Sequence, residues 1–229
     1  MNTLVNVARY HLVDRVSLVA LPWGILAFSF LVNVVVSLSV PTGPHGIYTG
    51  GLATIYVFLL VCGALSMTRS LPFGLMLGVS RHRYYLGTAL LVLVLGVVYG
   101  LGLTLLQAVE RATHGWGVSL HFFRVPWIMD GPWYQTWLTS FVLLVLCFLY
   151  GIWYGLVFRR WSVPGLVAFI SAQILVALLV VVTVSITHNW PAFGHFFTTV
   201  TALALTGVLA AVAAAMGLGG LTTVRRVTI

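Results

Sequence analysis

Side chains able to perform acid–base or metal chemistry are few in this chain of 229 residues. The acids are Asp14, Glu110 and Asp130, and all eleven basic residues are arginine, with no lysine. A Walker A motif needs a lysine on the nucleotide phosphates, and no HExxH motif occurs. The chain therefore lacks any ATP-hydrolysing motif, and we expect neither a catalytic residue nor a cofactor of its own.

The connection at residues 107–136 holds the best constellation for an enzyme: His114, His121, Arg124 and Asp130. Loops of this length gather such residues by chance, so an enzyme or a scaffold is the least favoured interpretation. Five histidines are assigned to the same outer side, but their spacing matches no zinc signature. We expect these histidines to be solvated or interfacial and predict no metal site: His45, His114, His121, His188 and His195.

The composition indicates that most of the chain forms membrane-spanning helices, which must position the residues named above. Hydrophobic residues make up 61% and charged residues 6% of the chain, and the mean hydropathy is +1.09. A spanning helix needs about 20 mostly apolar residues. The sequence predicts an all-α, multi-pass protein with one transmembrane domain, 1–229, and spans near 17–40, 51–68, 85–107, 137–158, 164–187 and 198–220.

The arginines predict the orientation of these spans. Cytoplasmic flanks retain Arg and Lys, and nine of the eleven arginines fall on one side: Arg9, Arg15, Arg69, Arg81, Arg83, Arg159, Arg160, Arg225 and Arg226. On the other side, Arg111 and Arg124 are balanced by Glu110 and Asp130. We expect both termini in the cytoplasm of a plasma membrane, a bacterial one in our interpretation. The charge indicates topology rather than nucleic-acid binding.

Two short amphipathic helices are expected on the cytoplasmic face. One covers residues 1–16 and would lie on the leaflet; the alternative is a frayed terminus that continues the first span. The other covers 71–79, which is too short to span; Ser70 would cap it and Pro72 would fit its first turn. It ends at Gly78, before Arg81, His82 and Arg83. This is the only sizeable cytoplasmic loop, so a soluble partner would meet it.

Small and polar residues inside the spans suggest how the helices associate. Stripes of small residues let backbones approach, within one subunit or between two; they are Gly96, Gly100, Gly151, Gly155, Gly207, Ala211, Ala215 and Gly219. Asn33, Gln107 and Gln173 are the candidate polar groups of a transport pathway. Such groups more often hydrogen-bond neighbouring helices, which remains the favoured interpretation.

At the 69–84 loop the chain resembles the permease subunits of ABC-2-type ABC transporters. Those subunits have six spans, an amphipathic N-terminal helix and a cytosolic coupling helix between the second and third spans. The local match is carried by Leu71, Pro72, Phe73, Gly78, Val79, Ser80, Arg81, Tyr84, Tyr85, Leu86 and Gly87. In that family short external helices usually lie between the fifth and sixth spans, whereas here that loop is only about ten residues long.

The resemblance implies that a separate ATPase subunit, which binds ATP and Mg, docks on this loop. It also implies a second permease, either another copy or a related chain. The residues expected to couple to the ATPase are Leu71, Pro72, Phe73, Gly78, Ser80, Arg81, His82, Arg83 and Tyr84. The expected function is export of an amphipathic or hydrophobic cargo. A self-contained secondary transporter or channel is the alternative; neutral-residue pores exist.

Overall fold

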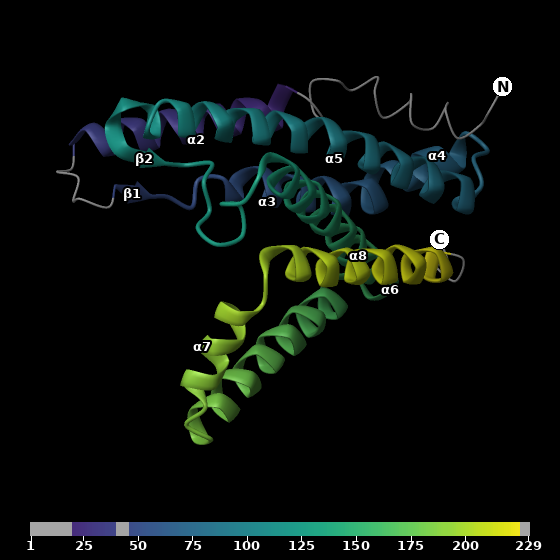
Figure 1. Cartoon of the computed structure of the whole chain (residues 1–229). Coiled ribbons are helices and arrows are strands. Elements are labelled where there is room, and N and C mark those ends of the chain that lie inside the picture. The colour runs from purple at the N-terminus through teal and green to yellow at the C-terminus, as the bar shows by residue number, and fades with distance from the viewer. Residues whose placement is uncertain (1–19, 40–45, 225–229) are drawn as a thin grey trace.

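The computed structural model describes residues 20–39 and 46–224, which are mostly helical (Figure 1). The expected helix at 1–16 and His45 lie outside the described residues. The elements in chain order are α2 (Leu21–Ser39), β1 (Ile47–Tyr48), α3 (Ala53–Leu65), the π-helical η2 (Ser66–Ser70), α4 (Leu71–Met76), α5 (Arg81–Ala112), the π-turn segment η3 (Gly115–Ser119), β2 (Leu120–His121), α6 (Trp133–Ile186), α7 (Trp190–Thr199) and α8 (Ala202–Val224).

Five helices in the described part of the chain are long and apolar enough to cross a membrane. They are α2, the run from α3 through η2 to α4, α5, α6 and α8. The chain is therefore an all-α protein embedded in a membrane. The predicted spans at 17–40, 51–68, 85–107 and 198–220 each fall on one of these helices. The ends agree within about five residues, except that the second helical run continues through α4 to Met76, eight residues past the predicted end.

Helix α6 contains both of the remaining predicted spans. It has 54 residues, which at 1.5 Å per residue is about 80 Å, more than twice the thickness of a hydrocarbon core. Its backbone leaves helical geometry at Ser162 (φ 55°, ψ −151°), two residues before Pro164, and Figure 1 shows α6 changing direction along its length. A six-span arrangement requires α6 to cross twice, with Ser162 at the turn.

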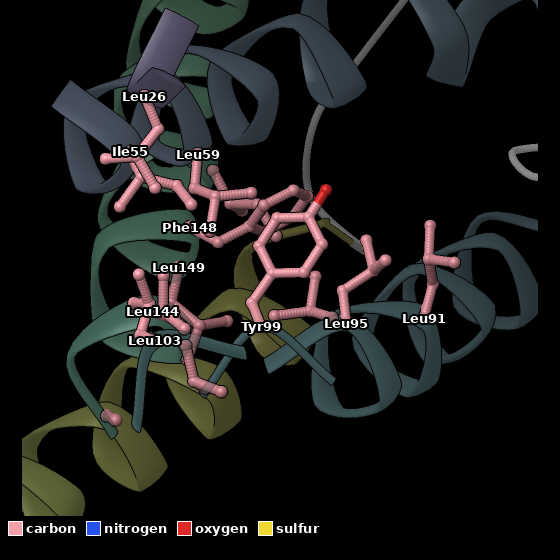
Figure 2. Packing of buried hydrophobic residues seen from close by; sticks show 14 of the residues in the cluster. Leu26, Ile55, Leu59, Leu91, Leu95, Tyr99, Leu103, Leu144, Phe148 and Leu149 are labelled. Atoms are coloured by element: carbon pink, nitrogen blue, oxygen red, sulfur yellow. The ribbon is translucent and has the colours of Figure 1, made fainter. Parts of the chain in front are cut away.

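The core lies where α2, α3, α5 and the first half of α6 meet. Figure 2 shows Leu26 and Ile55 close to Leu59 and Phe148, with Tyr99 pointing toward the same cluster. All five side chains are almost completely buried. Burial of such side chains supplies packing contacts that fix the helices relative to one another.

Two pairs of glycines allow helices to approach one another closely, one pair in α6 and one in α5. A Cβ at Gly151 would collide with the carbonyl oxygen of Leu60, and a Cβ at Gly155 would lie 2.7 Å from the carbonyl oxygen of Ala64. Thus α6 packs backbone to backbone against α3. In α5, Gly96 and Gly100 instead face aromatic side chains of α6, those of Phe141 and Trp137.

The small-residue stripe of α8 is only partly packed against another helix. Gly219 faces Trp153 of α6, but Gly207 has no neighbouring atom within 4 Å of an added Cβ. Ala211 and Ala215 are exposed. The predicted stripe is therefore divided between a contact within the chain and an outward face.

The part of α6 after Ser162 and the following α7 extend away from the other helices (Figure 1). Residues 163–195 are exposed or half-buried throughout. Tyr154 makes contacts across the turn: its hydroxyl donates to Gln173 Oε1 at 2.8 Å, and its ring packs edge-on against Phe169 at 5.3 Å between centroids.

Candidate functional site

The segment between the second and third predicted spans folds as η2, α4 and a tight turn. Pro72 lies in the first turn of α4, where its missing N–H costs nothing. At the other end Gly78 has φ +80°, Gly78 N–H donates to Leu75 O, and Val79 N–H donates to Gly74 O. These two bonds form a Schellman motif, which ends a helix.

Two details differ from the sequence-based prediction. The helix expected over 71–79 ends at Met76, because the left-handed backbone at Gly78 stops it early. Ser70 has helical φ/ψ and makes no side-chain cap bond, since α4 continues directly from η2. Ser80 caps α5 instead: its backbone is extended and its side chain accepts a hydrogen bond from Arg83 N at 3.5 Å.

The inner face of α4 is anchored to the membrane helices. Leu71 and Gly74 are buried, and the ring of Tyr84 packs beside Gly74. Tyr84 is 1% exposed and its hydroxyl donates to the Ser66 carbonyl at 2.9 Å. Leu71 and Tyr84, both expected to couple to a partner, therefore hold the segment in place rather than form its outer surface.

The outer face of α4 combines apolar and basic groups. Phe73, Met76 and Leu77 are exposed, Met76 by 86%, and His82 and Arg83 are exposed just beyond the turn. Met76 and Leu77 were not among the predicted coupling residues, although their spacing from Phe73 (i, i+3, i+4) could have indicated them. We call the exposed residues Phe73, Met76, Leu77, His82 and Arg83 the α4 surface.

The three polar groups predicted for a pathway lie in separate places. Asn33 donates to Ser29 O in its own helix at 2.8 Å, Gln173 accepts from Tyr154, and the buried Gln107 amide donates to Met129 O. Each has a partner within the chain. The structure does not bring them together.

At the opposite end of the molecule (Figure 1), residues 113–132 fold over α2 and α5; we call them the cap. Ile47 pairs with Leu120 and Tyr48 with His121 in a parallel strand pair. Phe30 of α2 packs its ring against Trp116, Phe122 and Phe123 at centroid distances of 4.9, 5.3 and 5.9 Å. Thus Trp116, Phe122 and Phe123 pack against α2, whereas Trp127 of the same loop is partly exposed.

Glu110 organises the backbone of the cap. Its carboxylate is 1% exposed and accepts hydrogen bonds from the backbone N–H of Phe122, Phe123 and Arg124 at 3.0, 2.8 and 3.1 Å, and from Trp116 Nε1 at 3.2 Å. Four donors compensate the desolvation of a buried charge. From the sequence, Glu110 was predicted only to balance the charge of an arginine. Its position as a single acidic residue at the end of an apolar helix could have indicated a structural role.

An ion pair closes the cap beside Glu110. Arg124 donates to both carboxylate oxygens of Asp130, at 2.7 and 2.8 Å, and Arg111 lies 3.7 Å from Asp130 Oδ1 while donating to Met129 O and Gly131 O. The hydrogen bond from Arg124 holds the pKa of the Asp130 carboxyl below its usual value, and the nearby charges act in the same direction.

The residues proposed for an enzyme constellation line one cavity of about 360 Å³ in the cap, together with Glu110 and Arg111. His121 stacks on Tyr48 at 4.6 Å between centroids, and its Nδ1 lies 3.9 Å from Glu110 Oε1. Both carboxylates are already bonded to donors from this chain. In the described residues no three His, Cys, Asp or Glu side chains are placed to hold a metal ion.

Comparison with protein-family models, curated proteins and solved structures finds no match for this chain. The functional interpretation therefore depends on the α4 surface, the cap and the charge distribution.

Proposed function

We propose that this chain is the membrane subunit of an ATP-driven ABC transporter and that the α4 surface receives a separate ATPase subunit. The observation that carries the proposal is the α4 surface itself: three exposed apolar side chains next to His82 and Arg83, on a helix whose opposite face is fixed by Leu71, Gly74 and Tyr84. A helix that is anchored on one face can transmit a push from a partner to the spans that flank it.

The division of charge supports a cytoplasmic position for the α4 surface. Arg69, Arg81, Arg83, Arg159 and Arg160 lie in or beside η2, α4, the start of α5 and the α6 turn. We call this the arginine end. The carboxylates of the described residues, those of Glu110 and Asp130, lie at the cap instead. By the positive-inside rule, the arginine end faces the cytoplasm, where ATP is available.

The absence of lysine from the sequence supports a separate subunit that binds ATP. A P-loop cradles phosphates with a lysine, and this chain has none. ATP and Mg would therefore bind to the partner. Closure of two partner ATPases would move the α4 segments of two permeases, either identical or related, and rock their spans between inward-facing and outward-facing states.

Helix α7 adds to the resemblance with ABC-2 permeases. The ten-residue connection between the fifth and sixth predicted spans folds as a short helix, Trp190–Thr199. A short helix at this place is the arrangement that the resemblance implies for the external side. One short helix at this place is compatible with the proposal, although the longest external connection still follows the third predicted span.

An apolar cargo agrees with the surfaces of the spans. A groove of about 440 Å³ lies between α5, α6 and α8, with Ala89, Val142 and Ala213 among its lining residues. Its walls are almost entirely apolar. We therefore favour export of an amphipathic or hydrophobic molecule.

Copurification tests the proposal directly. The full-length chain is expressed with the soluble Walker A protein that the proposal expects in a neighbouring reading frame. The amount of this protein retained is compared for the parent chain, Arg81→Glu/Arg83→Glu and Phe73→Ala/Met76→Ala. Both double variants should lose most of the ATPase, because one reverses the charge of Arg83 on the α4 surface and of the neighbouring Arg81, and the other removes the apolar contacts of this surface. Arg160→Glu, a single charge reversal at the same end, should keep it.

Two results would contradict the proposal. Full coupling of hydrolysis to transport in the Arg81→Glu/Arg83→Glu variant would exclude docking on the α4 surface. Transport by the purified chain in vesicles without any ATPase would instead indicate the self-contained carrier or channel.

A further inference from the structure

A groove of about 530 Å³ runs between α3, η2 and α6 at the arginine end. Its walls are mostly apolar and include Leu60, Val61 and Leu65 of α3 and Phe158 of α6. The Tyr154 hydroxyl in the wall is already used, because it donates to Gln173. The groove therefore offers an apolar surface within the membrane-spanning part of the molecule.

One end of this groove is polar and positively charged. Thr68 and Arg69 of η2 line it, and Arg69 is exposed. Arg159 reaches across from α6, where its Nη1 donates to the Thr68 carbonyl at 3.4 Å. Arg69 thus lies in the groove wall, and the guanidinium group of Arg159, from a different element, is hydrogen-bonded to the wall residue Thr68.

The described residues supply no anion for these two guanidinium groups. Their carboxylates, Glu110 and Asp130, are both engaged in the cap, at the other end of the molecule (Figure 1). Arg159 Nε is moreover buried without a hydrogen-bond partner among these residues. A buried charged donor left without an acceptor is costly, so an acceptor from another molecule would stabilise this arrangement.

We propose that this groove binds an anionic phospholipid, whose phosphate contacts Arg69 and Arg159 while an acyl chain lies along the apolar walls. The groove is complementary to a molecule that is apolar along most of its length and anionic at one end. Guanidinium groups pair with phosphate oxygens through two parallel hydrogen bonds, and basic pockets between membrane helices on the cytoplasmic side suit acidic headgroups. This inference holds whether or not the α4 surface receives an ATPase.

Native mass spectrometry of the detergent-purified full-length chain tests the inference by titration with phosphatidylglycerol and with phosphatidylcholine of the same acyl chains. The parent chain should bind phosphatidylglycerol more tightly. Arg69→Gln should weaken phosphatidylglycerol binding about fivefold, the effect expected of one arginine at a membrane surface. It should weaken phosphatidylcholine binding less, because the choline cation offsets the charge of the phosphate in that lipid. Arg69→Lys should retain most of the affinity, because the charge remains. Arg69 is exposed, so these changes do not threaten folding.

Two further variants separate the groove from general electrostatics. Arg160 stacks on the Trp161 ring at 4.8 Å and is not part of the groove wall, so Arg160→Gln should bind phosphatidylglycerol like the parent chain. Val61→Trp, at a 46% exposed position, should fill the groove and weaken binding of both lipids.

Three outcomes would overturn the inference. Equal affinity for the two lipids would show that the arginines do not select the headgroup. An equal loss in Arg69→Gln and Arg160→Gln would indicate a delocalised charge effect instead of a site. Displacement of phosphatidylglycerol by an equal concentration of glycerol phosphate, which has no acyl chain, would identify a free phosphate site.

Discussion

At the scale of single residues, the Glu110 carboxylate holds the cap together. It accepts three backbone N–H groups and one indole N–H from residues 116–124. Glu110→Gln removes the charge and turns an amide NH₂ toward these donors. Since hydrogen bonds to charged groups contribute about 2 kcal/mol each, we expect a loss of about 2 kcal/mol or more in the free energy of unfolding.

Limited proteolysis and denaturant unfolding in micelles measure this loss. Cleavage within the cap should become faster in Glu110→Gln. Thr113→Ala removes a neighbouring hydroxyl bonded to Val109 O, Glu110 O and the Trp116 N–H. It is the comparison and should be cleaved more slowly than Glu110→Gln, because it removes no charged acceptor. Unchanged cleavage of Glu110→Gln would show that the cap does not depend on this carboxylate.

Asp130 should make the stability of the cap sensitive to acid. The Arg124 hydrogen bond lowers the pKa of Asp130 in the folded chain relative to about 3.9 in an unfolded chain. The stabilisation is therefore fully present above about pH 4 and is lost as the pH falls through the lower folded value. Because the pair is partly exposed, we expect Asp130→Asn to cost only about 0.5 kcal/mol at neutral pH.

Unfolding of the parent chain and Asp130→Asn at neutral and strongly acidic pH measures this effect. The difference in the free energy of unfolding between them should shrink in acid. A difference that stays constant with pH would mean that the Asp130 charge does not stabilise the cap.

At the scale of elements, the approach of α3 and α6 depends on glycine. A side chain at Gly151 meets the Leu60 backbone, whereas the same change at Gly207 meets open space. Gly151→Val should force the two helices apart and cost more than about 3 kcal/mol, as overpacking against backbone does at its upper limit. Gly207→Val, in another predicted stripe, is the matched control and should leave the free energy of unfolding nearly unchanged.

Thermal unfolding and gel filtration of both variants distinguish stripes that pack helices within the chain from stripes that form contacts between subunits. Similar melting temperatures for Gly151→Val and the parent chain would contradict the close packing of α3 and α6. If Gly207→Val unfolds normally but elutes as a smaller species than the parent chain, the outward stripe of α8 is a contact between subunits.

At the scale of the whole molecule, the turn at Ser162 predicts that α6 crosses the membrane twice and that the chain crosses it six times. Single cysteines labelled from either side test this in a chain whose Cys62 and Cys147 are replaced by serine. The positions are His82 near α4, Ala112 at the end of α5, Val163 after the α6 turn and Asn189 before α7. If α6 crosses twice, His82 and Val163 label from the cytoplasm, and Ala112 and Asn189 label from outside.

The structure guided the choice of Ala112. Gly115, in the same loop, is buried with φ +81°, and an added Cβ would lie 2.9 Å from Leu120 N. A cysteine there would disturb the cap that it is meant to report. Labelling of Val163 and Asn189 from the same side would refute the six-span arrangement.

Much of the architecture was predictable because hydropathy, charge and turn residues act locally. Runs of apolar residues indicated the membrane helices, and Pro72 and Gly78 indicated a short helix between the second and third spans. The end of that helix was misplaced by three residues, because its termination depends on the φ of Gly78 and on two backbone hydrogen bonds. At Ser162 the sequence predicted a short loop between two spans, whereas the structure has a break in the backbone of one long helix.

The sequence by itself therefore determined the class of the protein: an apolar, all-α chain in a membrane, with its arginines sorted to helix ends and no lysine for a phosphate-binding loop. Only the tertiary structure decided which side chains meet. Glu110 lies 12 to 14 residues from the amides that it binds in the cap, and Arg159 meets η2 across 91 residues of chain. Such contacts depend on how separate helices pack, which local patterns do not encode.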